Sequence, residues 1–175
     1  MEKGSKIYVA GHTGLLGSAV VRVLRLAGYN NLLLIAHREL DLTNQQAVKD
    51  MFKNHRPDYV FLCAGKVGGI MANSTQRGDF IYINMLIQFN IIDSAYRYGV
   101  TKLIAVGSSC IYPAHSAQPI KEEYLLSGSL EPTNEPYAIS KIAALKLCDA
   151  YRSQYGCDFI SAMPTILSGV WDIYA

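Results

Sequence analysis

Three glycines near the start of the chain constrain its fold more than any other feature. The segment from Lys6 to Gly17 reads K-I-Y-V-A-G-H-T-G-L-L-G, so an apolar run is followed by Gly11, Gly14 and Gly17 at a spacing of three. Helical periodicity then covers residues 15–26. In a strand, glycine turn and helix of this kind, a backbone without side chains brings the helix N–H groups close to a pyrophosphate. The segment predicts a dinucleotide site, and the alternative is a tight turn that binds no ligand.

Apolar runs and helical patterns alternate along the rest of the sequence. This alternation predicts an α/β fold, a doubly wound parallel sheet (a Rossmann fold) with helices on both faces. Ligands in such sheets bind beyond the carboxyl ends of the strands. Residues 66–77 and 111–136 are expected to form loops, the first of them able to move. The expected strands cover residues 7–10, 31–36, 59–64, 103–106 and 159–163, and the expected helices cover residues 15–26, 43–54, 79–98 and 137–155.

Length and composition place the chain among ordinary globular proteins. Its 175 residues are 50% hydrophobic and 17% charged with a net charge of +2, which suits one domain and disfavours a nucleic-acid platform. No apolar run reaches the ~20 residues of a membrane span, and the N-terminus shows no signal-peptide pattern. The four cysteines have no disulfide or metal-ligand spacing, so we expect no metal site and a reducing, cytoplasmic location.

The residues after the second expected strand bear on the choice between NAD and NADP. An acid at this position favours the free 2′-hydroxyl of NAD, while a basic residue accommodates the 2′-phosphate of NADP. Here the pair His37-Arg38 follows the strand, about 20 residues after the glycines. The pair favours NADP(H) as the cofactor, and the alternative is a solvated loop.

Tyr137, Lys141 and Ser108 form the pattern that carries chemistry. Tyr137 and Lys141 are four residues apart at the start of an expected helix, so they share one of its faces. A phenol exchanges protons poorly at neutral pH unless its anion is stabilised, and an ammonium one turn away supplies that charge. Ser108, at an expected strand end, can donate a hydrogen bond to a substrate carbonyl. Together they suit hydride transfer at an oxygen-bearing carbon, whereas a Tyr-x-x-x-Lys pair alone is often a surface feature.

These residues resemble the extended short-chain dehydrogenase/reductases, the NAD-dependent epimerase/dehydratase group. The resemblance runs from about Lys6 to Thr165 and rests on four further segments. They are A-G-H-x-G from Ala10, K-V-G-G-I from Lys66, G-S-S-C-I-Y-P from Gly107 and L-E-P-T-N-E-P-Y-A-I from Leu130. The last two resemble members of the group that act on a GDP-linked 4-keto-6-deoxy sugar.

The resemblance implies an NADPH-dependent enzyme that epimerises C3 and C5 of the sugar and then reduces C4. Cys110 matches the group's acid/base for epimerisation, and the alternative is a small core residue. Tyr137, Lys141 and Ser108 match the reduction step, while Asn84 and Pro164 match positions near the active site and the nicotinamide. The expected cofactor-binding residues are Gly11, Gly14, Leu15, Leu16, Gly17, His37, Arg38, Asp41, Leu42, Ala64, Gly65, Lys141 and Pro164.

The sequence departs from the group at three places. Residues 74–78, which read S-T-Q-R-G, differ from the group's usual loop. Thr13 stands where many members have an arginine that is expected near the cofactor phosphate. After Thr165 the resemblance ends, so we expect residues 1–165 to form the NADP-binding domain and residues 166–175 to be a divergent tail in place of the substrate-binding half. That half carries the histidine that partners the group's cysteine. It is matched by none of the four histidines here, His12, His37, His55 and His115.

Two other functions stay open from the sequence. With an incomplete sugar pocket, the chain could be a cofactor-binding module or interaction protein without turnover. The other alternative is a nucleotide-sugar 4-epimerase or 4,6-dehydratase, although Cys110 argues against it because a dehydratase would more often have carboxylates after the strand-end serines. The expected partners are a GDP-sugar and a second copy of the chain paired through helices 79–98 and 137–155, with no nucleic acid and no membrane.

Overall fold

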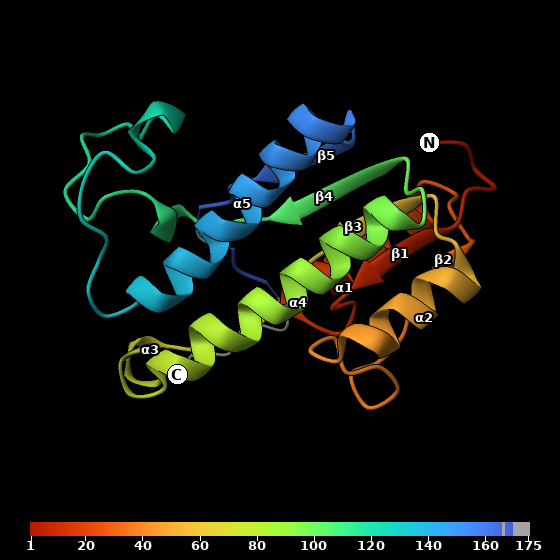
Figure 1. Ribbon diagram of the computed structural model, residues 1–175, viewed down its shortest axis with the longest axis horizontal. Helices are drawn as coiled ribbons and strands as arrows, with labels where there is room; N and C mark the ends of the chain where they lie inside the picture. Colours follow the sequence, from red (N-terminus) through yellow and green to blue (C-terminus); the bar gives the residue numbers. More distant parts are fainter. Residues whose placement is uncertain (166, 170–175) are drawn as a thin grey trace.

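The computed structural model describes residues 1–165 and 167–169. Its centre is a five-stranded, all-parallel sheet in the order β2-β1-β3-β4-β5 (Figure 1). This sheet confirms the doubly wound fold predicted from the sequence. Apart from residues 167–169, the expected tail of residues 166–175 lies outside the described residues. The strands are β1 (Ile7–Ala10), β2 (Leu32–Leu33), β3 (Tyr59–Leu62), β4 (Lys102–Val106) and β5 (Asp158–Ala162).

The order of the strands determines where a ligand can enter. The chain passes from β1 to β2 on one side and then returns to β3 on the other side of β1. The connections that leave the carboxyl ends of β1 and β3 therefore diverge in opposite directions. A crevice at such a point is the usual ligand site of an open parallel sheet.

Helices cover both faces of the sheet (Figure 1). Successive side chains of β1 point to opposite faces of the sheet. Ile7 packs in a core with Val21 and Leu24. The Tyr8 ring packs edge to face on Phe52, with the ring centres 5.9 Å apart. No helix in the described part of the chain has the length and apolar character needed to cross a membrane. In the view of Figure 1, α1 (Leu15–Leu26) lies behind the sheet, and α2 (Gln45–His55), α4 (Arg77–Arg97) and α5 (Glu135–Tyr155) lie in front.

Some elements begin or end elsewhere than the sequence predicts. β2 has 2 residues instead of the expected 31–36, because only Leu32 and Leu33 pair with β1 at this edge of the sheet. α5 begins at Glu135, inside the expected loop 111–136. Pro136 does not prevent this, because proline is tolerated in the first helical turn, where its missing N–H would have had no partner.

The two long connections are more regular than expected. α3 (Ile70–Thr75) occupies much of residues 66–77, and the buried Asn73 anchors it by donating from Nδ2 to the Gly68 carbonyl at 2.7 Å. The connection after β4 contains two short 3₁₀ helices, η1 (Ser109–Ile111) and η2 (Glu122–Tyr124). It packs on α5 through a small apolar cluster that includes Ile111. These connections therefore pack on neighbouring helices, α3 on α4 and η1 on α5.

Candidate active site

The glycine turn between β1 and α1 forms one wall of the site. Gly11 has a φ of 80°, and a Cβ on it would lie 2.7 Å from the backbone nitrogen of Ala64. A Cβ on Gly17 would lie only 2.1 Å from the carbonyl oxygen of Gly11. These two glycines are therefore required by the turn itself. Gly14 differs, because the nearest atom to its Cβ position is 3.5 Å away, and the turn is open to a ligand there.

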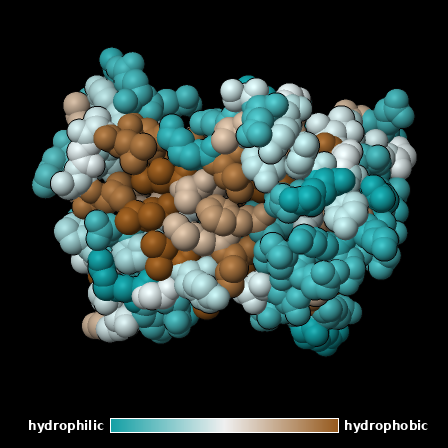
Figure 2. Space-filling view, viewed as in Figure 1, coloured by the Kyte–Doolittle hydropathy of each residue, from teal (hydrophilic) through white to brown (hydrophobic). Residues whose placement is uncertain are grey.

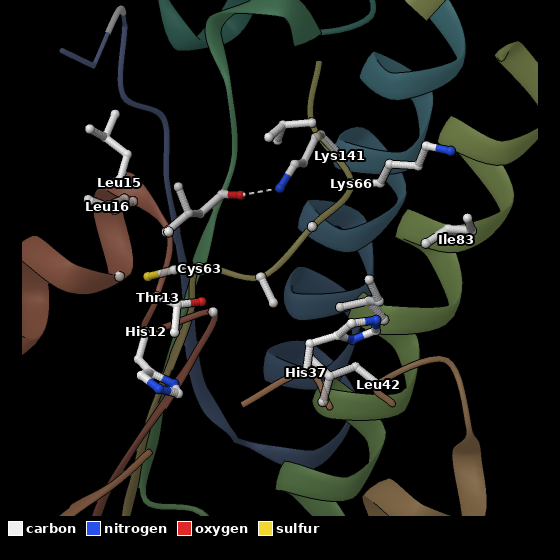
Figure 3. A pocket seen from close by; sticks show the side chains of 18 of the residues that line it. His12, Thr13, Leu15, Leu16, His37, Leu42, Cys63, Lys66, Ile83 and Lys141 are labelled. Carbon is white, nitrogen blue, oxygen red and sulfur yellow. Dashed lines mark hydrogen bonds between the residues drawn. The ribbon is translucent and has the colours of Figure 1, made fainter. Parts of the chain in front are cut away.

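A cavity of about 850 Å³ lies beyond the carboxyl ends of β1, β3 and β4 (Figure 3). Its volume is within the range of small-molecule and cofactor sites. In Figure 3, Leu15 and Leu16 lie on one side of the cavity, His37 and Ile83 lie on the opposite side, and Lys141 lies between them. The cavity thus extends from the glycine turn across the sheet edge to α4 and α5.

Most residues predicted to bind the cofactor line this cavity. Ser108 and Tyr137 line it too, so the predicted reduction residues and the glycine turn meet at one site. Three predicted residues are outside the lining: Arg38 is exposed beside His37, Cys110 lies in η1 after Ser108, and Asn84 lies in α4. The predicted cofactor residues in the lining are Gly11, Gly14, Leu15, Leu16, Gly17, His37, Asp41, Leu42, Ala64, Gly65, Lys141 and Pro164.

Residues of α4 and Thr43 also line the cavity, and the sequence did not predict them there. Tyr82, Ile83 and Leu86 of α4 line the cavity. The signal was the apolar character of more than one side of this helix, but periodicity does not tell whether a second side meets a ligand, the core or another chain. Thr43 also lines the cavity and donates its N–H and hydroxyl to Asp41 Oδ1 at 2.9 and 2.8 Å. These bonds lower the pKa of Asp41 and fix the loop after β2.

Lys141 is a buried charged residue in this site. Its Nζ donates to the Val106 carbonyl at 2.9 Å, the dashed line in Figure 3. Burial lowers the pKa of Lys141 from 10.5 to about 8, and charge on Cys63 opposes that shift. The same Nζ lies 5.7 Å from the centre of the Tyr137 ring. The ammonium is therefore held between a strand end and the phenol.

Tyr137 is partly buried next to Ser108. Burial raises the pKa of Tyr137, Cys110 raises it further, and a hydrogen bond with Ser108 lowers it. The net shift is opposite to the expectation that a nearby lysine charge favours the phenolate, because burial and Cys110 together outweigh the hydrogen bond with Ser108. The phenol therefore holds its proton at neutral pH, as a proton donor should.

Asn84 fixes the backbone at the point where β3 runs into the cavity. Its side chain is fully buried, with Oδ1 accepting from the Lys66 N–H at 2.8 Å. Nδ2 donates to the carbonyls of Lys66 at 2.9 Å and Phe80 at 2.8 Å. Asn84 is outside the cavity lining. Asn84 therefore holds the backbone that lines the cavity without lining the cavity itself.

Comparison with known proteins assigns the chain to a family. Residues 7–172 match the NAD dependent epimerase/dehydratase family. The match covers most of the chain, and the protein belongs to this family. This membership confirms the resemblance drawn from the sequence motifs.

Within the family, the chain is similar to GDP-L-fucose synthases. It is 58% identical over 168 residues to GDP-L-fucose synthase 1 of Arabidopsis thaliana, a match that covers 96% of this chain and 52% of that protein. It is 52% identical over 167 residues to GDP-L-fucose synthase of Escherichia coli strain K12, covering 95% and 52%. The chain spans about half the length of the curated relatives it matches.

A solved structure gives the same result for the fold. A GDP-D-glycero-L-gluco-heptose synthase from Campylobacter jejuni, determined in the presence of NADPH, superposes with a TM-score of 0.94 at 46% identity. The superposition covers 97% of this chain and 49% of that one. The fold is therefore shared with a protein whose structure was determined in the presence of NADPH.

Proposed function

We propose that the chain binds NADPH in this cavity and carries the reduction residues and the acid/base cysteine of a GDP-L-fucose synthase. The activity is epimerisation of GDP-4-keto-6-deoxy-D-mannose at C3 and C5 and reduction at C4. The observation that carries the proposal is that Ser108, Tyr137 and Lys141 line the same cavity as the glycine turn. The 58% and 52% identity to two GDP-L-fucose synthases supports the choice of substrate.

The residues of the cavity fit an NADP-type dinucleotide. Gly14 leaves the turn open, and the N–H groups in the first turn of α1 have no partner within the helix, so they suit a pyrophosphate. His37 lines the cavity after β2, with the exposed Arg38 beside it. A 2′-phosphate at this place would meet two basic side chains, which favours NADP(H) over NAD.

In the reduction, bound NADPH supplies the hydride that reaches C4. Tyr137 donates its phenolic proton to the C4 oxygen, and its raised pKa keeps that proton available. Ser108 donates a hydrogen bond to the same oxygen and orients the carbonyl. Lys141 holds a positive charge near the Tyr137 ring and stabilises the phenolate that remains.

In the epimerisation, Cys110 acts as a base on the sugar carbon. The C4 ketone acidifies the neighbouring C–H bonds, so a thiolate can take a proton from carbon. An S–H bond forms as the C–H bond breaks, and the electron pair moves toward the C4 oxygen. The enolate carbon then takes a proton from solvent on its opposite face, which inverts the centre, and the Cys110 thiol releases its proton to solvent. Cys110 follows Ser108 closely and influences the pKa of Tyr137, so it lies near the groups that bind this oxygen.

A turnover assay with GDP-4-keto-6-deoxy-D-mannose and NADPH tests this function. We expect the wild-type chain to oxidise NADPH only when the sugar nucleotide is present, with GDP-L-fucose as the product. The matched variant Tyr137→Phe should bind NADPH but lose turnover. If the wild-type chain binds NADPH and does not oxidise it, the alternative of a cofactor-binding module replaces the enzyme.

A second copy of the chain is the partner that we propose for α4 and α5. Apolar residues gather across the middle of the face that these helices present in Figure 2. Tyr96 and Tyr155 stack at 4.3 Å yet remain 36% and 44% exposed, and Phe89 is 39% exposed. Exposed apolar side chains on two adjacent long helices favour an interface over a solvated surface.

Light scattering on wild type and two variants tests the dimer. Phe89→Glu places a charge on α4 and should convert the dimer to a monomer. Leu26→Glu is the matched control, because Leu26 is 89% exposed on α1, on the other side of the sheet. A wild-type chain that is monomeric at all concentrations would remove the proposed interface.

A cytoplasmic location also belongs to the proposal. All four cysteines, Cys63, Cys110, Cys148 and Cys157, are free thiols. Free thiols persist in a reducing compartment, and the proposed acid/base role of Cys110 needs one.

A further inference from the structure

We infer that Asn134 is a positioning residue for Cys110, whose sulfur accepts a hydrogen bond from the Asn134 side-chain amide and is thereby stabilised as the thiolate. The inference deepens the proposed function and rests on it, because Cys110 is the base of the epimerisation step there. Asn134 acts through Cys110 and does not itself take a proton from the sugar.

The first observation is the contact itself. Nδ2 of Asn134 lies 3.3 Å from Sγ of Cys110, although 24 residues separate them in the sequence. Cys110 lies in η1, beyond the end of β4, and Asn134 directly precedes α5. The contact therefore joins the two elements that carry Ser108 and Tyr137.

The second observation is that the Asn134 side chain does not cap α5. Asparagine before the first residue of a helix usually accepts a hydrogen bond from a first-turn N–H. Asn134 is in this position before α5, yet α5 has no side-chain cap hydrogen bond. Its Oδ1 is buried and has no hydrogen-bond partner among the described residues. The side chain forgoes a stabilising cap, and its hydrogen bond goes to the sulfur.

The segment around Asn134 is held from outside. Arg77, the first residue of α4, donates from one terminal nitrogen to the Pro132 carbonyl at 2.6 Å and from the other to Glu135 Oε2 at 3.0 Å. These bonds lie on either side of Asn134 in the sequence. On the other side of the contact, the Cys110 N–H donates to Ser108 Oγ at 3.3 Å. Both partners are therefore fixed by bonds independent of the one between them.

A donor at the sulfur changes the protonation states of the site. The bond from Nδ2 is charge-assisted only when the sulfur is a thiolate, so it is stronger in that form. Negative charge on Cys110 raises the pKa of Tyr137 and keeps its phenol protonated. Asn134 thus favours a base at Cys110 and an acid at Tyr137, the opposite states that proton removal from carbon and reduction require.

Alkylation of Cys110 by iodoacetamide tests the inference on the 175-residue chain without cofactor or substrate. Only the thiolate reacts, and residues 103–121 form a tryptic peptide that contains Cys110 as its only cysteine. The rate is measured by mass spectrometry at about pH 7 and about pH 10, where most thiols are ionised. The rate at about pH 7 divided by the rate at about pH 10 reports the fraction of the cysteine that is thiolate at pH 7. Steric access to the sulfur affects both rates equally and drops out of the ratio. Cys157, partly exposed, is the internal reference in the same digest.

Three variants separate the hydrogen bond from packing. Asn134→Ala removes the donor and should lower the ratio for Cys110 by about tenfold. Asn134→Asp keeps the shape but places a carboxylate at the sulfur, and it should lower the ratio further. Thr133→Ala is the matched control, because its hydroxyl donates to Glu131 at 3.2 Å in the same turn and does not bond the sulfur. Its ratio should equal that of wild type.

The outcomes decide the inference independently of the enzyme's activity. A Cys110 ratio that stays within about twofold of wild type in Asn134→Ala and Asn134→Asp would overturn it, since a charged hydrogen bond contributes more than that. An equal fall in Thr133→Ala would also overturn it, because the effect would then come from the loop. A chain without turnover can still show the predicted ratios, so failure of the proposed function gives a different result from failure of this inference.

Discussion

Replacement of Lys141 by methionine should stabilise the fold at neutral pH. Lys141 is 7% exposed, and burial lowers its pKa from 10.5 to about 8. In the unfolded chain the side chain regains its ordinary pKa of about 10.4. Below both values the amine is charged in both states, so the folded state bears the whole penalty of burying the charge. Methionine has a similar shape and no charge, and it relieves that penalty.

The magnitude follows from the difference between the two pKa values. A shift from 10.5 to about 8 corresponds to about 3 kcal/mol against the folded state. The variant loses the hydrogen bond from Nζ to the Val106 carbonyl, 2.9 Å long, a loss of about 1 kcal/mol. We therefore expect Lys141→Met to be about 2 kcal/mol more stable near neutral pH, which raises the melting temperature by about 4–8 °C.

The pH dependence gives this prediction its sign. Between the two pKa values the unfolded chain binds a proton that the folded chain has lost, so the stability of the wild type rises with pH there. The advantage of Lys141→Met should shrink from about pH 8 and reverse near pH 10.5, where only the lost hydrogen bond remains.

Thermal unfolding followed by circular dichroism at a series of pH values measures this difference. Lys146→Met is the matched control, since Lys146 is an exposed lysine of the same helix and should change stability by less than about 0.5 kcal/mol. If Lys141→Met is less stable than wild type at neutral pH, the charge of Lys141 is compensated in the fold and the reasoning is refuted.

Three further predictions concern the cofactor and the chemistry. Gly17→Ala should abolish NADPH binding in calorimetry, because its Cβ would lie 2.1 Å from the Gly11 carbonyl oxygen. Gly78→Ala is the control and should bind NADPH as wild type does, because no atom lies within 4 Å of its Cβ position. Tyr137→Phe should lower turnover by about 10²-fold or more while leaving the NADPH dissociation constant nearly unchanged, and retained turnover would remove this phenol from the mechanism. Arg38→Ala should weaken NADPH binding by about tenfold or more with little effect on NADH, and equal losses would place recognition of the 2′-phosphate elsewhere.

Local requirements made much of the fold, and the glycine turn that forms one wall of the cavity, predictable. The glycine turn is predictable because Gly11 and Gly17 satisfy backbone contacts that no other residue can. Tyr137 and Lys141 share a helix face by spacing alone, so their meeting in one cavity needed only the correct helix. The alternation of apolar runs determined the parallel sheet, since each run is long enough to be a strand and each gap long enough for a crossover.

Features that depend on tertiary packing could not be predicted in this way. The pKa of Lys141 falls because the chain encloses it, and its sequence neighbours give no sign of that. The bond from Asn134 to Cys110 joins residues 24 positions apart through two connections of irregular shape. Likewise, α4 has apolar residues on more than one side, and only the packed structure shows that Ile83 lines the cavity.

Calorimetric titration of the purified chain with NADPH, and separately with NADH, decides whether the cavity is an NADP(H) site. We expect saturable binding of NADPH at one site per chain and binding of NADH weaker by about tenfold or more, because His37 and Arg38 are proposed to recognise the 2′-phosphate. A chain that is folded by circular dichroism and binds neither dinucleotide would show that the cavity is not a dinucleotide site.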